Sequence, residues 1–352
     1  MKFGNESINH PIKIKIIQMN KLFAILITLF MAACSNNPNE SVIKYKTIGT
    51  IERMDGSLDA ILNDGVSIEI ISEGHDWTEG PVWIESEKML LYSDIPPNKI
   101  FKWTEAKGKE LYLTPSGYTG TVARGGEPGS NGLVLNKEGK LVLCQHGDRR
   151  MALMDAELKA PAAKFISLAD NYQGKKLNSP NDAVFRSNGD LFFTDPPYGL
   201  ASDSVKEIPF QGVYKVTNGQ VTLLTDSVTR PNGIAFTNNE KSLLIANSDP
   251  EKAFWYLFDI GPNDVLSNGR IMHDATALSK SGEKGLPDGL KVDKMGNIFA
   301  SGPGGVFIFN AAGKQIGKLK IPEACSNIAL ADDDKTLFIT ADMYVLRVKM
   351  RK

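Results

Sequence analysis

Short apolar runs and polar turns alternate along most of this chain. Residues 141–144 and 191–194, for example, are apolar stretches that each follow a polar turn, and residues 136–140 and 187–190 supply those turns with Gly, Asn and Ser. Short runs of this kind between Gly/Asn turns are typical of strands joined into hairpins. The pattern therefore predicts an all-β protein.

The same arrangement recurs six times, at intervals of roughly 50 residues. Each unit opens with a polar residue and continues into an apolar strand, a turn and further strands. The opening residues are Glu79, Asn131, Asn181, Asn232, Asp288 and Asn327. Four strands per unit at this period are typical of a β-propeller blade. The sequence thus predicts a six-bladed β-propeller with four antiparallel strands in each blade; an open sandwich of two domains does not explain the shared register.

The last unit runs out of chain after three strands, and the start of the chain supplies a candidate for the fourth. Residues 67–72 have the fourth-strand pattern and precede Glu79 by the spacing at which Thr225 precedes Asn232. A propeller closed in this way has no exposed edge between its first and last blades. We therefore expect residues 46–352 to form a single propeller domain, closed by an N-terminal strand.

The first 33 residues have the pattern of a targeting segment and do not belong to this repeat. Residues 22–33 are apolar, follow Lys21 and end at Cys34. A basic start and a short apolar stretch are typical of a secretory signal and too short for a membrane span. Residues 31–34, Met-Ala-Ala-Cys, resemble the lipobox of bacterial lipoproteins.

We expect a signal peptide over residues 1–33, with Met19 an alternative start, and a lipidated Cys34 that begins a polar tether over residues 34–45. A plain signal peptide is the simpler alternative. The protein would then lie in the cell envelope, on the periplasmic side, attached to the membrane only through its lipid.

The net charge and the composition of the chain exclude some classes of function. The chain has 40 Lys and Arg against 41 Asp and Glu, which gives a net charge of −1. A nucleic-acid binder needs a basic surplus, so that class is excluded. Four His and three Cys leave little for a zinc cluster or a disulfide framework. The sequence leaves open whether Cys144 and Cys325 form a disulfide. We expect the protein to be a monomer.

The repeat also predicts a site. The first strand of every propeller blade lines the central channel, so the six opening residues should ring one mouth of it. All six carry carboxylates or carboxamides, and such oxygen donors suit Ca²⁺, with Mg²⁺, Mn²⁺ or Zn²⁺ as alternatives. A polar mouth filled by water is the simpler alternative.

Further residues should reach the same mouth. The second strands return to it and end at Asp94, at residues 145–146 and at Asp195. The loop over residues 114–130 is long enough to form a lid. A second long loop begins at residue 196.

Several motifs in these units resemble one family. They are residues 79–83 (Glu-Gly-Pro-Val-Trp), 178–182 (Asn-Ser-Pro-Asn-Asp), 193–199 (Phe-Thr-Asp-Pro-Pro-Tyr-Gly), 230–233 (Arg-Pro-Asn-Gly) and 287–289 (Pro-Asp-Gly). They resemble the six-bladed propellers of the senescence marker protein (regucalcin), gluconolactonase and lactonase-like family. Residues 144–150 resemble its bacterial gluconolactonase branch. The resemblance covers roughly residues 68–348.

This resemblance implies a divalent metal bound by Glu79, Asn232 and Asp288, with Asn181 at or beside it. Substrate contacts are expected from Asn181, His146, Arg124, Tyr198 and Asp195. One departure concerns Ser179, because animal members carry an Arg at that position. Arg124 or Arg149 would have to supply the charge.

The implied activity is hydrolysis of a sugar lactone such as D-glucono-1,5-lactone. A metal would polarise the carbonyl and water would be the nucleophile, since no Gly-x-Ser-x-Gly elbow is present. The resemblance favours Asp288 as general base, with His146 as its competitor. Two alternatives stay open: a propeller hydrolase for another lactone, ester or phosphoester, and a non-catalytic, lipid-anchored binding propeller.

Overall fold

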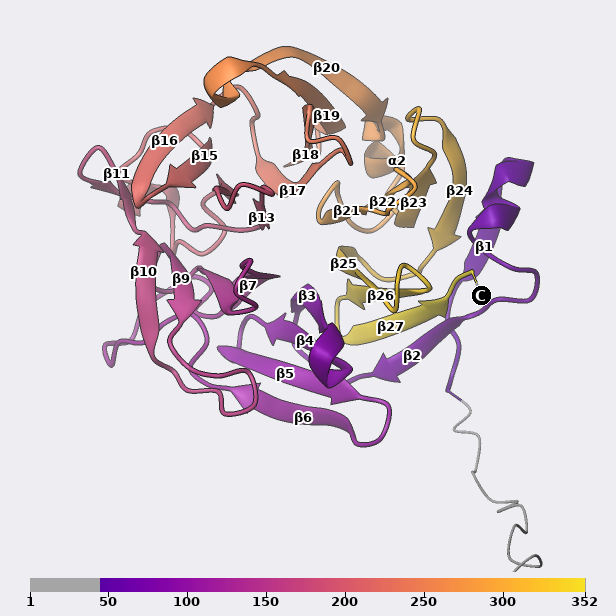
Figure 1. Ribbon diagram of the computed structural model, residues 1–352, viewed down its shortest axis with the longest axis horizontal. Coiled ribbons are helices and arrows are strands. Elements are labelled where there is room, and N and C mark those ends of the chain that lie inside the picture. The colour runs from indigo at the N-terminus through magenta and orange to yellow at the C-terminus, as the bar shows by residue number, and fades with distance from the viewer. Residues whose placement is uncertain (1–44, 352) are drawn as a thin grey trace, which may run out of the picture. The chain divides into compact units, whose positions relative to one another are not determined.

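The computed structural model describes residues 45–351, and here the chain forms six small antiparallel sheets arranged as a ring (Figure 1). The predicted six-bladed β-propeller is confirmed. The predicted signal peptide, Cys34 and nearly all of the tether lie outside the described residues. Within residues 45–351 no helix is long and apolar enough to cross a membrane.

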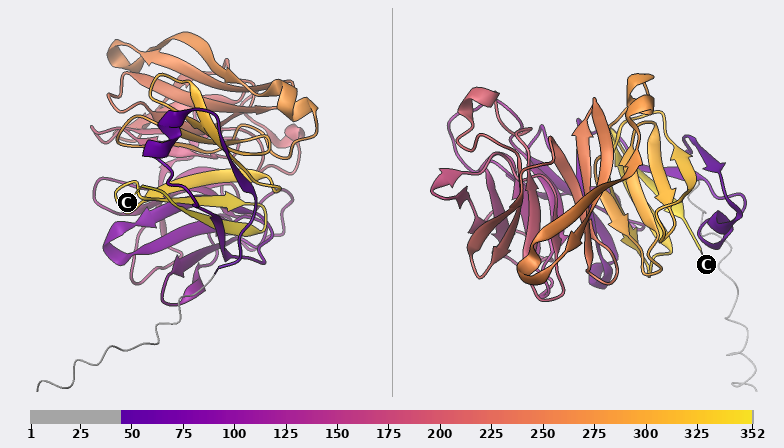
Figure 2. Two further views of the ribbon diagram at one scale, coloured as in Figure 1. Left: turned by 90° about the vertical axis from the view of Figure 1, so that its right-hand side faces the viewer. Right: turned by 90° about the horizontal axis from the view of Figure 1, so that it is seen from above.

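Each blade runs from an inner strand at the axis to an outer strand at the rim (Figure 1), and Figure 2 shows the same ring from its edge. Blade one contains β3 (Thr78–Ile84), β4 (Met89–Asp94), β5 (Lys99–Thr104) and β6 (Gly108–Leu113). Blade two contains β7 (Ser130–Leu135), β8 (Leu141–Gln145), β9 (Arg150–Met154) and β10 (Phe165–Ala169). Blade three contains β13 (Ala183–Phe185), β14 (Leu191–Asp195), β15 (Gly212–Thr217) and β16 (Gln220–Thr225).

The second half of the ring repeats this order. Blade four contains β17 (Pro231–Phe236), β18 (Ser242–Asp249), β19 (Lys252–Ile260) and β20 (Leu266–Asp274). Blade five contains β21 (Leu290–Val292), β22 (Ile298–Gly302), β23 (Gly305–Phe309) and β24 (Gln315–Lys320). Blade six contains β25 (Cys325–Ala331), β26 (Thr336–Ala341) and β27 (Tyr344–Lys349).

Short elements lie between these strands. They are η1 (Gly56–Ala60), η2 (Glu85–Glu87), β11 (Asn171–Tyr172), β12 (Lys175–Lys176), η3 (Asp203–Val205), η4 (Pro262–Asp264) and α2 (Thr276–Lys280).

The N-terminal strand closes the ring as expected. β2 (Ile68–Ser72) is the fourth strand of blade six and pairs antiparallel with β27, with Ile68 opposite Val348 and Ile70 opposite Leu346. The sequence pattern did not indicate a further strand, β1 (Thr50–Arg53), which adds a fifth strand to blade five by pairing with β24. Gly317 in β24 leaves room there for Leu58, since a Cβ at Gly317 would lie 2.6 Å from the Leu58 side chain.

The position of each strand in its blade explains the apolar pattern. Second strands such as β4 and β8 are buried along their whole length because neighbouring blades cover both of their faces. The outer strand β6 alternates exposed and less exposed positions instead. The buried apolar residues fall into six clusters, and each joins two adjacent blades. The junction of blades six and one, where Phe338 packs near Trp83 and Trp103, is built like the others.

Candidate active site

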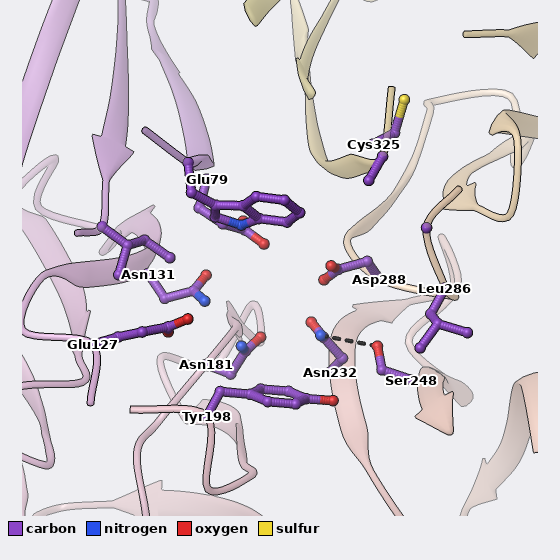
Figure 3. A pocket seen from close by; sticks show the side chains of 14 residues that line it. Glu79, Glu127, Asn131, Asn181, Tyr198, Asn232, Ser248, Leu286, Asp288 and Cys325 are labelled. Atoms are coloured by element: carbon purple, nitrogen blue, oxygen red, sulfur yellow. Dashed lines mark hydrogen bonds between the residues drawn. The ribbon is translucent and has the colours of Figure 1, made fainter. Parts of the chain in front are cut away.

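A cavity of about 380 Å³ opens on the axis of the ring. Its wall combines ring residues with residues from the loops of one face (Figure 3). The lining residues are Trp77, Glu79, Ile95, Glu127, Asn131, Asn181, Tyr198, Asn232, Ser248, Gly285, Leu286, Asp288, Ala324 and Cys325. Five of the six residues predicted to ring the channel mouth are therefore brought together.

Glycines in the inner strands allow these residues to converge. A Cβ at Gly80 would lie 2.2 Å from the carbonyl oxygen of Asn131, and one at Gly132 would lie 2.7 Å from that of Asn181. The amide of Gly132 also donates a hydrogen bond to the Asn181 carbonyl, at 2.8 Å. Because each glycine follows a ring residue directly, the inner strands approach closely where their polar side chains meet.

The sixth predicted ring residue, Asn327, lies elsewhere. Gly289 donates its amide proton to the carbonyl of Ser326, just as Gly132 does to that of Asn181, so Ser326 holds the sixth ring position. Asn327 lies one residue further along the strand. Its amide nitrogen is 3.2 Å from Glu79 Oε2 and 3.4 Å from Asp182 Oδ2. The repeat alignment was one residue out of register in blade six.

Several oxygens in the ring are buried and unsatisfied. Oδ1 of Asn131, Asn181, Asn232 and Asp288 has no hydrogen-bond partner among the residues the structure describes. A buried acceptor without a partner costs about 1–3 kcal/mol. In Figure 3 these side chains point toward one another across a common space. The arrangement suits a ligand that brings positive charge or hydrogen-bond donors.

The donor set suits a hard cation. Carboxylate and amide oxygens are the ligands that Ca²⁺ takes, and thiol sulfur or imidazole nitrogen is not needed. Over residues 45–351 no three His, Cys, Asp or Glu side chains are grouped so as to hold a metal ion. A cation in this ring would therefore depend on the amides of Asn181 and Asn232 as much as on the carboxylates of Glu79 and Asp288.

Burial changes the acidity of the two ring carboxylates. Loss of solvent raises the pKa of Glu79 to about 8. It also raises the pKa of Asp288 well above its usual range, with a further contribution from the charge of Glu79. Both effects disfavour two negative charges in an enclosed site. A divalent cation would offset that repulsion and displace the protons.

Residues at the ends of the second strands hold the loops that lead into the ring. Asp94 accepts hydrogen bonds from the backbone amides of Asp76 and Trp77, at 3.1 and 3.0 Å. Asp195 accepts one from the amide of Asn178 at 2.7 Å, and Asn247 accepts one from that of Arg230 at 2.7 Å. This device recurs in blades one, three and four.

The expectation that Asp195 contacts substrate does not fit this position. Its side chain is fully buried behind the cavity wall, and burial raises its pKa to about 7. Tyr198, by contrast, lines the cavity as expected, beside Asn181 and Asn232 (Figure 3).

Arg124 and His146 also lie behind the cavity wall rather than on it. Arg124 donates to the carbonyls of Gly147 and Gly199, at 2.8 and 2.6 Å, and so ties three loops together. His146 is fully buried, with Nδ1 2.8 Å from Oε2 of Glu127. Both side chains bond to protein groups in this arrangement, and a direct contact of either with substrate stays a prediction.

Sequence reasoning missed Glu127, Ser248 and Trp77 as lining residues. Glu127 lies in the loop predicted to be a lid, where an acidic residue among Gly and Pro looks like an ordinary surface residue. Cys325 also reaches the cavity. It and Cys144 are free and buried, which settles the question of their pairing.

The chain is thus a six-bladed β-propeller with an oxygen-lined cavity on its axis. Residues 77–342 match the family model of the SMP-30/gluconolactonase/LRE-like region. Gluconolactonase of Zymomonas mobilis subsp. mobilis is 35% identical over 91% of this chain and 90% of its own. This chain belongs to the SMP-30/gluconolactonase/LRE-like family, as its motifs predicted.

Solved structures of other proteins share this fold. A gluconolactonase from Xanthomonas campestris superposes with a TM-score of 0.75 at 26% identity and covers 88% of this chain and 99% of its own. Regucalcin, a calcium-binding protein from Agrobacterium tumefaciens, shares the fold with a TM-score of 0.62 at 16% identity, over 80% of this chain and 94% of its own. The predicted enzyme class, a lactone hydrolase, is confirmed by the gluconolactonase relatives.

Proposed function

We propose that this protein hydrolyses a sugar lactone in the axial cavity, with D-glucono-1,5-lactone as the first substrate to test. The observation that carries the proposal is the convergence of four unsatisfied buried oxygens on one cavity. Its volume of about 380 Å³ is in the range of small-molecule sites. The gluconolactonase of Zymomonas mobilis supports the choice of substrate.

We further propose that the site works with a divalent cation, Ca²⁺ first, held by Glu79, Asn181, Asn232 and Asp288. When bound, such a cation supplies a Lewis acid for the lactone carbonyl. The fit rests on the oxygen donors of the ring and on the burial of two carboxylates that lack a counter-charge within the cavity wall.

Asp288 is the proposed proton acceptor. Its carboxylate lines the cavity, whereas His146 does not. As water adds to the carbonyl carbon, one water proton passes to the Asp288 carboxylate. The bond from that carbon to the ring oxygen then breaks, and the ring oxygen takes a proton to leave as a hydroxyl of the aldonic acid.

A pH-stat assay tests this function. Purified protein should release acid from D-glucono-1,5-lactone faster than spontaneous hydrolysis does, and chelator or Asp288→Asn should remove that excess. Asp64→Asn is the matched control, because the Asp64 side chain is 99% exposed. Metal binding by calorimetry without turnover of any lactone would favour a binding propeller instead, and turnover of other lactones or esters alone would change the substrate class.

The location is a separate proposal. We propose that the protein is anchored in the cell envelope through a lipid on Cys34, because residues 22–34 have the lipoprotein signal pattern. Labelled palmitate should be incorporated by the wild type and not by Cys34→Ser. Equal labelling of both proteins would contradict the anchor.

A further inference from the structure

Glu127 places a carboxylate in the cavity that does not belong to the oxygen ring. It comes from the loop between blades one and two and lies beside Asn131 and Asn181 (Figure 3). Its side chain is 41% exposed, so a molecule in the cavity can reach it. Over the described part of the chain its Oε1 makes no hydrogen bond, while Oε2 bonds to His146.

The imidazole of His146 holds this carboxylate, and the guanidinium of Arg124 holds the loop that carries it. His146 Nδ1 lies 2.8 Å from Oε2, and the backbone amide of His146 donates to the carbonyl of Gly129 at 3.1 Å. Arg124 contacts the carbonyl of Glu127 at 3.4 Å and fixes the same loop to Gly147 and Gly199. The loop is therefore braced from both sides of Glu127.

The state of His146 agrees with a positioning role. Its ring is fully buried, and Nε2 has no hydrogen-bond partner among residues 45–351. Nδ1 thus makes the one hydrogen bond of the ring, and that bond goes to Glu127. With the Nδ1 proton donated to Oε2, the imidazole orients the carboxylate and leaves its other oxygen available to a ligand.

We infer that Glu127 selects polyhydroxylated lactones by accepting a hydrogen bond from a ring hydroxyl, and that His146 and Arg124 position it. This inference rests on the proposed lactone hydrolysis. A lactone without hydroxyls would leave Oε1 of Glu127 without a donor in a partly desolvated wall, and sites built to bond a hydroxyl discriminate strongly against such analogues. A hydrogen bond to a charged group contributes about 1.5–3 kcal/mol, which corresponds to roughly tenfold to hundredfold in rate.

The test compares two six-membered lactones, D-glucono-1,5-lactone and the unsubstituted δ-valerolactone. Glu127→Gln should lower kcat/KM for gluconolactone by about tenfold to hundredfold and change that for δ-valerolactone by less than about threefold. Calcium affinity measured by calorimetry should stay the same. Glu138→Gln, in an exposed turn, is the charge-matched control and should change neither rate.

His146 is tested by rescue. His146→Asn keeps an N–H donor near the position of Nδ1 and should retain the preference for gluconolactone, whereas His146→Leu should lose it. An equal fall on both lactones, or a loss of calcium affinity in Glu127→Gln, would overturn the inference while leaving the hydrolase function intact. A wild type that hydrolyses neither lactone would overturn the proposed function and this inference with it.

Discussion

The side-chain nitrogen of Asn232 donates a hydrogen bond to Ser248 Oγ over 3.1 Å. An amide carries its oxygen on the opposite side, so this bond turns Oδ1 of Asn232 toward the cavity, where it has no partner in the described chain. Ser248 in turn donates to the carbonyl of Pro287, the residue before Asp288. One hydroxyl therefore orients an amide from blade four and braces a carboxylate from blade five.

Replacing Ser248 should weaken cation binding without unfolding the protein. Ser248→Ala frees the Asn232 amide to rotate and removes the brace on Pro287, so we expect the Kd for Ca²⁺ to rise about tenfold. Calorimetry on the chelator-treated protein measures this. Ser202→Ala, on an exposed loop, is the control, and an unchanged Kd in Ser248→Ala would contradict the role given to the hydroxyl.

The metal-free protein should lose stability as pH rises. Glu79 has a folded-state pKa of about 8 against an ordinary value of 4.5, and burial also raises the pKa of Asp288 and of Asp195. Between pH 4.5 and about pH 8 the folded chain holds a proton on Glu79 that the unfolded chain has released. A rising pH therefore favours unfolding.

Thermal melts in chelator should therefore show Tm falling from pH 5 to pH 8. Added Ca²⁺ should raise Tm most at the alkaline end, where the carboxyls ionise with the least opposition. Glu79→Gln should flatten the fall in chelator. A Tm that climbs over this range in the absence of metal would show that the carboxyls are not held protonated.

Gly80 should be far less tolerant of a side chain than another glycine of the same blade. Its φ is 53°, and a Cβ would lie 2.2 Å from the Asn131 carbonyl oxygen. Gly108 has a similar φ of 65° but nothing within 4 Å of such a Cβ.

Gly108→Ala should therefore cost only the left-handed backbone conformation, about 1–2 kcal/mol, while Gly80→Ala adds a clash with the backbone of the next blade. We expect Gly80→Ala to lower the free energy of unfolding by at least 3 kcal/mol or so, as measured by urea titration. Equal losses for both variants would mean that strand approach at the axis is not restricted.

The two N-terminal strands, β1 and β2, should contribute differently to the stability and solubility of the protein. A protein that begins at Gly65 lacks β1 but keeps β2, and one that begins at Gly74 lacks both strands. Without β2 the edge of β27 is open, and the apolar residues Ile68 and Ile71, both buried, are gone. We expect the first truncation to stay soluble with a lowered Tm and the second to aggregate. Size-exclusion chromatography separates the outcomes, and a soluble, monomeric second truncation would show that closure by β2 is dispensable.

The repeat predicted most of this fold because each blade repeats one pattern of burial. The second strands are apolar throughout, and the turns carry Gly and Asn, so the register can be seen in the sequence alone. β1 was not predicted for two reasons. The repeat contains no second strand like Thr50–Arg53, and the exposed and less exposed residues of this strand alternate only weakly. The place of Asn327 was missed because Ser326 holds the ring position in blade six and Asn327 stands where Gly132 stands in blade two, so that an alignment on the Asn residues is one residue out.

For the site, the repeat placed five of its six ring residues correctly at the cavity, and Tyr198 also lies there as expected, whereas Arg124 and His146 lie behind the wall. Glu79, Asn181, Asn232 and Asp288 follow from strand register. The positions of Glu127, Arg124 and His146 depend on how the loop over residues 114–129 folds back on two other loops, and local sequence does not specify such contacts. Asp195 was assigned to the right mouth, but its hydrogen bond to the Asn178 amide turns the carboxylate away from the cavity.

The pairing of β2 with β27 means that the first and last strands of the ring belong to one sheet. The blade that holds both ends of the chain is therefore built like the other blades. The ends of the chain can be moved to another loop. A protein in which Met350 is linked to Ser67 and new ends are opened in the exposed turn at residues 137–140 loses β1 and η1 but keeps four strands in every blade and the whole axial cavity. The position of the chain ends and the order of the blades around the ring are therefore separable.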